Sequence, residues 1–269
     1  DTVGLMMVNR PGFHMFDAAA MMLGACPFSV YNTNPPDVIR YVMGDAGNDV
    51  VITERKFVEV LREAGAAKTI VSLDGGGDLG IGDLVAKADP DFDLDAAWRA
   101  VEPSDLLTLI YTSGTTGPPK GVEITHANMM AELNGCHDAV PQHTDGRQVS
   151  FLPAAHIADR WASHYGAFMT YGNTVTSCAN LPDLFDIVAQ VRPTIFGAVP
   201  RVWEKLKAGG EAKLGGDGPA TALLAPRGAR GELEQRGGPV PPEPPPDLSC
   251  REAAAFRPAG GAAGRPDVS

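Results

Sequence analysis

The sequence predicts an α/β protein, with parallel sheets flanked by helices over residues 1–208 and a disordered tail over residues 209–269. Short runs rich in valine, isoleucine and leucine alternate with amphipathic stretches of helical length, which is typical of parallel βαβ units. After residue 208 this alternation stops. Proline and glycine rise to roughly a third of the residues with no period, which is a composition of disorder rather than of a packed core.

In the first part of the chain, apolar runs bounded by turn residues predict four strands, at 2–8, 26–31, 49–53 and 68–73. Helices are expected between them, at 11–24, 37–44 and 54–65. Pro11 suits a first helical turn, where its missing N–H costs nothing. Residues 75–105 are polar and glycine-rich, so we expect a connector with short helices there.

Beyond the connector the alternation resumes. Strands are expected at 106–111, 121–125, 148–152, 173–177 and 192–199. Helices are expected at 126–137, 157–171, 181–191 and from Pro200 onward. Thr125 is a suitable N-cap for the first of these helices.

The composition limits the classes of function. The formal net charge of -11 at pH 7 argues against nucleic acid as the main partner, because binding a phosphate backbone requires clustered Lys and Arg. Four scattered cysteines with no Cys-x-x-Cys pair predict neither a disulfide framework nor a zinc site, and they favour a reducing cytoplasm. No apolar run approaches the roughly 18 residues of a transmembrane helix. The chain begins at Asp1 without an initiator Met, so we expect it to be the interior of a longer protein.

A loop of glycines and hydroxyl residues, TSGTTGPPKG at 112–121, follows the strand expected at 106–111. Glycines let the backbone turn its N–H groups toward an anion, hydroxyls add donors, and a lysine adds a mobile positive charge. The candidate polyphosphate-binding residues are Thr112, Ser113, Gly114, Thr115, Thr116, Gly117 and Lys120. The alternative is an ordinary hairpin loop. Ten consecutive positions of this composition disfavour that alternative.

The spacing within the loop distinguishes it from a Walker A loop. A Walker A loop has four residues between its glycines, then Gly-Lys-Ser/Thr and a helix. Here two residues separate Gly114 from Gly117, and two prolines precede Lys120. The residues that follow look like another strand, so the loop is expected to join two strands.

These residues resemble a known family. TSGTTGPPKG, followed by Val122 and by THAN at 125–128, is similar to the signature of the adenylate-forming (AMP-binding) superfamily. Its members use ATP to convert a carboxylate to an acyl-adenylate and pyrophosphate, and then pass the acyl group to a thiol. The resemblance implies ATP, Mg²⁺ and coenzyme A as ligands, a Mg²⁺ contact at Thr112, and β/γ-phosphate contacts at Thr115, Thr116 and Lys120.

A second informative stretch, FLPAAHIADR at 151–160, places His156 just past the strand expected at 148–152. Ligands bind at the carboxyl ends of strands in open α/β sheets. A single histidine is more often a helix cap or a core residue, so that interpretation stands beside the functional one. The stretch resembles the Leu-Pro-Leu-Ala-His-Ile-x-Glu-Arg run of long-chain fatty acyl-CoA synthetases, with departures at Ala154 and Asp159. The resemblance implies that His156 lines the acyl-adenylate site and takes part in the change to thioester formation.

The region after residue 208 admits two explanations. One is a flexible tail; the other, which we favour, is a shifted reading frame, because Ala, Gly, Pro and Arg dominate and the family-like sequence stops within an element. We find no Tyr-Gly-x-Thr-Glu run, no Thr-Gly-Asp and no C-terminal lid with its lysine, which the family uses for adenine, ribose and transition-state contacts. Losing such groups should cost many orders of magnitude in rate.

The sequence therefore predicts part of the large N-terminal domain of a long-chain fatty acid–CoA ligase, with Lys120 and His156 as catalytic residues, and with the chain inactive alone. Two alternatives remain: an amino-acid or other carboxylate adenylation domain, and a non-catalytic nucleotide-binding remnant. The expected partners are fatty acid, ATP and CoA. Peripheral contact with a membrane is compatible with this function because fatty acids partition there.

Overall fold

The computed structural model describes residues 1–112, 117–139 and 144–214, with the side chains of Leu206 and of 209–214 left out. Residues Asp1–Gly197 form one compact unit, and a second unit begins at Ala198. Of the tail expected to be disordered, residues 209–214 belong to the last described helix, and residues 215–269 lie outside the described residues. The expected boundary after residue 208 falls within the last described helix and stays a prediction.

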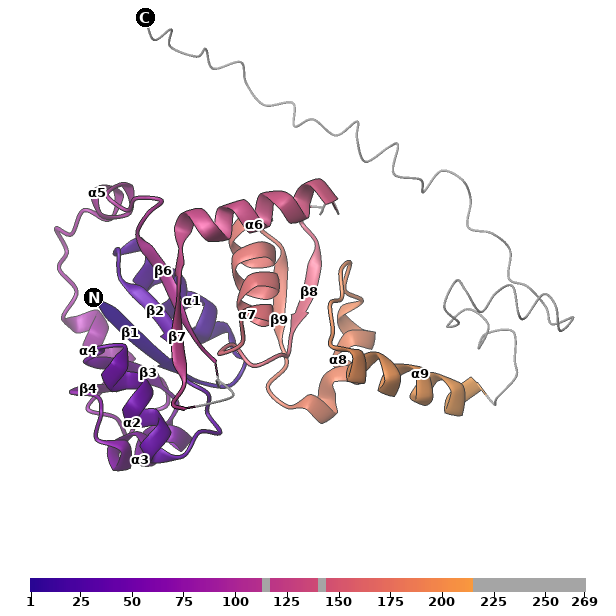
Figure 1. Ribbon diagram of the computed structural model, residues 1–269, viewed down its shortest axis with the longest axis horizontal. Coiled ribbons are helices and arrows are strands. Elements are labelled where there is room, and N and C mark those ends of the chain that lie inside the picture. Colours follow the sequence, from indigo (N-terminus) through magenta and orange to yellow (C-terminus); the bar gives the residue numbers. More distant parts are fainter. Residues whose placement is uncertain (113–116, 140–143, 215–269) are drawn as a thin grey trace, which may run out of the picture. The chain divides into compact units, whose positions relative to one another are not determined.

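The first unit contains a parallel five-stranded sheet, with strand order β2-β1-β3-β4-β5 (Figure 1). Its strands are β1 (Thr2–Met6), β2 (Cys26–Ser29), β3 (Val50–Thr53), β4 (Thr69–Ser72) and the two-residue β5 (Leu79–Gly80). This confirms the α/β fold class and the parallel βαβ units. The sequence pattern does not predict β5, since two residues carry no periodicity.

Helices cover both faces of this sheet. They are α1 (Pro11–Met22), α2 (Pro36–Asp45), α3 (Arg55–Ala64), α4 (Ile81–Ala86) and α5 (Leu94–Arg99). Successive strand residues point to opposite faces. Met6 therefore packs in the core with residues of α2 and α3, whereas its neighbour Leu5 packs with Phe13 of α1 and Leu84 of α4. α3 ends at Gly65, which adopts the left-handed conformation with φ of 63°.

The phosphate-loop region is a strand pair, as expected. β6 (Leu106–Thr112) pairs antiparallel with β7 (Lys120–Thr125). The hydroxyl of Thr108 in β6 donates to the carbonyl of Pro27 in β2 over 2.7 Å, and the Tyr111 hydroxyl donates to Asp45 of α2 over 2.8 Å. These bonds fasten the strand pair to the edge of the five-stranded sheet.

A third group of elements completes the first unit. It contains α6 (His126–Ala139), β8 (Arg147–Ser150), α7 (Ile157–Asp159), a π-helix η1 (Arg160–Thr170), β9 (Thr174–Ser177), a 3₁₀ turn η2 (Leu181–Asp183) and α8 (Leu184–Val191). β8 and β9 pair in parallel. Thr125 caps α6, since its hydroxyl accepts from the Asn128 N–H over 3.2 Å.

Two expectations for this region were wrong in detail. The single helix expected at 157–171 is one α turn followed by the π-helix, in which backbone bonds reach five residues back, as from Tyr171 to Gly166. The strand expected at 192–199 is absent. Arg192 ends α8 with φ of 49°, and Pro193 has no N–H to donate. Thr194 makes a backbone bond to Arg147 of β8, but no ladder follows.

The second unit contains α9 (Pro200–Leu214), which begins at the expected proline. The indole of Trp203 donates to the carbonyl of Ala198 over 3.1 Å, which ties the first turn of the helix to the residues before it.

Candidate functional site

The ends of the phosphate loop face each other on neighbouring strands. Thr112 is the last residue of β6 and Lys120 the first of β7, and they are directly paired across the strands. Both side chains are exposed. Of the other predicted loop residues, Ser113, Gly114, Thr115 and Thr116 lie outside the described residues. The strand pair thus brings one hydroxyl and one ammonium group to the same end of the hairpin.

The described part of the loop suits an anion. Gly117 has φ of 102°, a conformation that L side chains rarely adopt, so a glycine is required there. Within the described part of the chain, the ammonium group of Lys120 has no carboxylate partner. It is therefore available to a negatively charged ligand.

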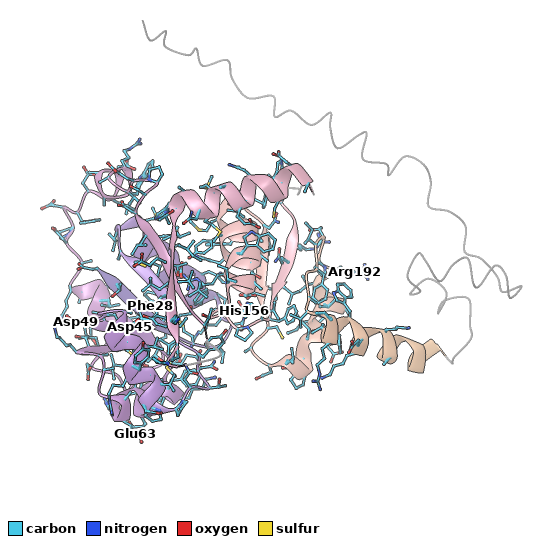
Figure 2. The ribbon with its side chains drawn as sticks, in the orientation of Figure 1. Phe28, Asp45, Asp49, Glu63, His156 and Arg192 are labelled. Carbon is cyan, nitrogen blue, oxygen red and sulfur yellow. The ribbon has the colours of Figure 1, made fainter. Side chains whose placement is uncertain are left out.

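His156 lies at the N-cap of α7, just beyond β8 (Figure 2). Its Nδ1 accepts a hydrogen bond from the N–H of Ala158 over 3.1 Å, and the side chain is exposed. A nitrogen that accepts carries no proton, so a neutral His156 holds its proton on Nε2. The capping role considered from the sequence is therefore present, and it leaves an outward N–H donor.

Asn9 connects the end of β1 with the end of β8. Its side-chain amide donates to the Ser150 hydroxyl and to the Leu152 carbonyl, each over 2.8 Å. β1 lies between β2 and β3, so the connection after β1 leads to β2 on one side, whereas the connection after β3 leads to β4 on the other side. The carboxyl edge at such a switch point is where open α/β sheets bind ligands. The segment leading to His156 is thus fixed to this edge.

The buried side chain of Asp159 also holds the segment that leads to His156. Its carboxylate accepts from the hydroxyls of Ser150 and Ser163, each over 3.0 Å. Burial raises the pKa of Asp159 to about 6, although both serine bonds oppose the shift. The departure from the family's glutamate at this position therefore keeps a carboxylate with two hydroxyl donors.

A buried polar cluster beneath His156 was not predicted from the sequence. It consists of Asp17 and His14 of α1 and of Arg160 and His164 of η1, and it contains an Arg160–Asp17 ion pair. Burial alone would raise the pKa of Asp17, but the charges of Arg160 and His164 outweigh it and lower that pKa. The available signal was the pair of polar residues three positions apart within an otherwise apolar helix.

A pocket of about 400 Å³ is lined in part by Ile157 and Ala158, the two residues that follow His156 in the chain. Its lining is mainly apolar and comes from β7, α6, α7 and η1: Ile124, Asn128, Met129, Glu132, Ile157, Ala158 and Trp161. Ile124 follows Lys120 on the same strand, and Ile157 follows His156 in the chain. The pocket therefore lies between the two segments that the sequence singled out.

No three His, Cys, Asp or Glu side chains within residues 1–112, 117–139 and 144–214 are grouped to hold a metal ion. An exposed Thr112 hydroxyl nevertheless fits Mg²⁺ of the kind that takes one or two protein ligands and the oxygens of substrate phosphates. None of the helices described is both long and apolar enough to cross a membrane.

The chain is similar to named acyl-CoA ligases. It is 46% identical over 167 residues to a Mycobacterium tuberculosis (strain ATCC 25618 / H37Rv) protein named as fatty-acid–CoA ligase fadD11, covering 62% of this chain and 29% of that protein. Against the long-chain-fatty-acid–CoA ligase FadD15 of the same organism, identity is 31% over 252 residues, covering 89% and 42%. The chain thus spans between a quarter and a half of the length of these relatives.

Solved structures share the fold. O-succinylbenzoate coenzyme A synthetase (MenE) from Bacillus subtilis, in complex with AMP, matches with a TM-score of 0.66 at 22% identity, covering 89% of this chain and 48% of that one. The inhibitor-bound N-terminal domain of FACL13 from Mycobacterium tuberculosis matches with a TM-score of 0.64 at 22% identity, covering 88% and 60%. The profile of the family described as AMP-binding enzyme matches residues 1–245. The chain belongs to the AMP-binding enzyme family.

Proposed function

We propose that this chain carries the phosphate-binding and acyl-binding parts of a fatty acid–CoA ligase. In the proposed reaction a fatty carboxylate attacks the α-phosphorus of ATP, giving acyl-adenylate and pyrophosphate. The thiol of CoA then attacks the acyl carbon, giving acyl-CoA and AMP. The observation that carries the proposal is the apolar pocket between β7, which begins at Lys120, and the turn that holds His156.

The phosphate end of the site would be the β6–β7 hairpin. Thr112 and Lys120 face each other at its loop end, and Lys120 has no competing carboxylate among the described side chains. Together with the hydroxyls of Thr115 and Thr116, the ammonium group would hold the β- and γ-phosphates and leave the α-phosphorus in line with the carboxylate. Mg²⁺ bound at the Thr112 hydroxyl would supply neutralisation of the phosphate charge.

The acyl end would be the pocket. Ile124, Met129, Ile157 and Trp161 offer apolar surface, and burying each methylene of a chain contributes about 0.8 kcal/mol. The names of the relatives support a fatty acid, and those of FadD15 and others support a long chain. An apolar pocket also disfavours the zwitterion of an amino acid, which would need charged partners.

His156 would lie where the two ends meet. Its Nδ1 is occupied by the Ala158 amide, so its Nε2–H can donate to an oxygen that gains negative charge during acyl transfer. We further propose a cytoplasmic location with peripheral membrane contact, because the substrate partitions into membranes.

Filling the pocket tests the acyl part of the proposal. Ala158→Trp should place an indole in the pocket and weaken binding of a long-chain fatty acid at least about tenfold, measured by fluorescence or calorimetry. Ala131→Trp is the matched control, because Ala131 is exposed on α6 and does not line the pocket. Equal affinities for the two variants would show that fatty acid does not bind in this pocket.

Activity of the isolated chain is the second test. Because the sequence has no adenine, ribose or lid motif, purified chain given ATP, Mg²⁺, CoA and a fatty acid should form no acyl-CoA above background. Product accumulation followed by mass spectrometry checks this expectation. ATP-dependent acyl-CoA formation would overturn the proposed inactivity while supporting the ligase chemistry.

A further inference from the structure

The side chain four residues after His156 is fully buried and charged. Arg160 donates through Nη2 to the carboxylate of Asp17, and neither side chain is exposed. Arg160 also donates to the Ser29 hydroxyl over 2.7 Å and to the Tyr165 hydroxyl over 2.8 Å. A further contact of 3.2 Å reaches the carbonyl of Pro27. The guanidinium group is thus held from α1, β2 and η1 at the same time.

Two histidines extend this cluster. Nε2 of His164 lies 2.9 Å from the second oxygen of Asp17, and Nδ1 of His164 lies 3.1 Å from Nδ1 of His14. Burial, and then the neighbouring His164, lower the pKa of His14 to about 4, so His14 is neutral near pH 7. A neutral His14 can donate or accept at the Nδ1 that faces His164, according to its tautomer.

The cluster lies directly behind the turn that carries His156. The backbone N–H groups of Asp159 and Arg160 contact the His156 carbonyl, at 3.2 and 3.4 Å. Asp159 is held in turn by Ser150 and Ser163. The exposed imidazole and the buried guanidinium are therefore the two ends of one turn of backbone.

Stability alone gives a weak reason for such an ion pair. Replacing a buried ion pair by apolar side chains of similar volume is often neutral or stabilising, whereas removing one partner is strongly destabilising. What an apolar pair does not supply is direction, because dispersion contacts tolerate rotation and a guanidinium fork does not. The arrangement fits a role in fixing the orientation of the turn.

We infer that Asp17 and Arg160 are positioning residues that set the orientation of His156. The inference deepens the proposed function, since the use of a fixed His156 rests on that function. The geometry of the turn does not depend on it. Both residues lie in parts of the chain far apart in sequence, so α1 would orient the reactive turn through this contact.

A double variant distinguishes an effect on the orientation of His156 from an effect on the global stability of the protein. Asp17→Asn/Arg160→Met removes both charges with little change in side-chain volume, so the protein should stay folded with a moderate loss of global stability from the unpaired Ser29, Pro27 and Tyr165 groups. Positioning predicts that the Ala158 amide, which is bonded to His156 Nδ1, exchanges with solvent at least about tenfold faster. In a histidine-labelled sample, the ¹⁵N shifts of His156 should move toward the tautomer mixture of a free imidazole. Unchanged exchange and shifts in the folded double variant would overturn the inference.

Two further variants control for global destabilisation and for the case in which the double variant does not fold. Leu61→Ala destabilises the core beside α3 without touching the turn, so it should leave the His156 shifts in place. Tyr165→Phe removes one partner of Arg160 while keeping the ring, and it serves if the double variant does not fold. Faster Ala158 exchange in Tyr165→Phe supports positioning, and wild-type exchange overturns it. Neither readout uses ATP or fatty acid, so failure of the proposed function would leave this result intact.

Discussion

The carboxyl group of Asp159 is buried, so folding of the protein favours its protonated form. Burial raises its pKa from the usual 3.8 to about 6, and hydroxyls of Ser150 and Ser163 oppose the shift only in part. Between these two pH values the folded protein binds more protons at this site than the unfolded chain. The contribution of Asp159 to stability is therefore largest at low pH and is lost as the pH rises through about 6.

Replacing Asp159 by an uncharged side chain should weaken the pH dependence of the free energy of unfolding between about pH 4 and pH 7. The free energy of unfolding of Asp159→Asn, relative to wild type, should grow by up to about 3 kcal/mol between pH 4 and pH 7, because the variant has no charge to bury. Urea unfolding at several pH values checks this. Asp17→Asn is the contrast: the pKa of Asp17 is lowered, so its difference from wild type should change in the opposite direction. If the free energies of unfolding of Asp159→Asn and wild type changed with pH in the same way, the raised pKa of Asp159 would be contradicted.

At the scale of residues, the sequence predicted single positions better than their partners. It placed Thr112 and Lys120 together and anticipated the capping bond of His156, because these follow from local pattern, whereas the role of His156 at an acyl-adenylate stays a prediction. The Asp17–Arg160 pair joins positions 143 residues apart, so no local spacing reveals it. Asp17 fell within the helix expected at 11–24 but was given no role, and its charge on the buried face was the unused clue.

The β6–β7 hairpin shows how an element depends on one small residue. A Cβ added at Gly121 would lie 3.0 Å from Cζ and 3.2 Å from the hydroxyl oxygen of Tyr111. Tyr111 itself packs in the core of the larger sheet and donates to Asp45. The aromatic ring therefore occupies the space above Gly121, and it must shift by a few tenths of an ångström to admit a methyl group.

Gly121→Ala should accordingly destabilise the fold by about 1–3 kcal/mol through overpacking. Gly44→Ala is the matched control: Gly44 lies within α2, and no atom lies within 4 Å of the position that an alanine methyl would take, so alanine should stabilise by about 0.5–1 kcal/mol. Denaturant unfolding of the two variants measures both values. A Gly121→Ala protein as stable as wild type would show that the Tyr111 ring shifts at no cost in stability.

At the scale of elements, helices and strands with clear periodicity were predicted and irregular ones were not. Strands β1 to β4 and helices α1 to α3 follow from apolar runs, caps and turn residues. The π-helix η1 was not foreseen, because its length and composition resemble those of an α-helix. Arg160, Ser163 and His164 are all buried within it, and these long-range contacts cannot be read from the local sequence. The expected strand at 192–199 was wrong because apolar content there outweighed the proline and the absence of a partner strand.

At the scale of the whole molecule, the proposed site is assembled from two sheets. The hairpin of β6 and β7 supplies the phosphate end, and the turn between β8 and η1 supplies His156. Asn9 joins the His156 segment to the carboxyl edge of the main sheet. The relatives are considerably longer than this chain, so the complete reaction belongs to the proposal rather than to the geometry of these residues.

This division of the site has a measurable consequence. The sequence contains the proposed phosphate loop but no Tyr-Gly-x-Thr-Glu run and no Thr-Gly-Asp, the motifs expected to contact adenine and ribose. The affinity of the chain for a nucleotide should therefore come mainly from the polyphosphate. Inorganic tripolyphosphate should bind nearly as tightly as ATP, and both should depend on Lys120.

The most direct measurement is calorimetric titration of the purified chain with ATP and with tripolyphosphate, using wild type, Lys120→Ala and Lys68→Ala. Lys68 is an exposed lysine paired with Asp49, so its loss controls for net charge. The account predicts affinities within a few-fold for the two ligands, an approximately tenfold loss in Lys120→Ala, and little change in Lys68→Ala. Binding that is the same in Lys120→Ala and wild type would contradict the assignment of this loop as the phosphate site.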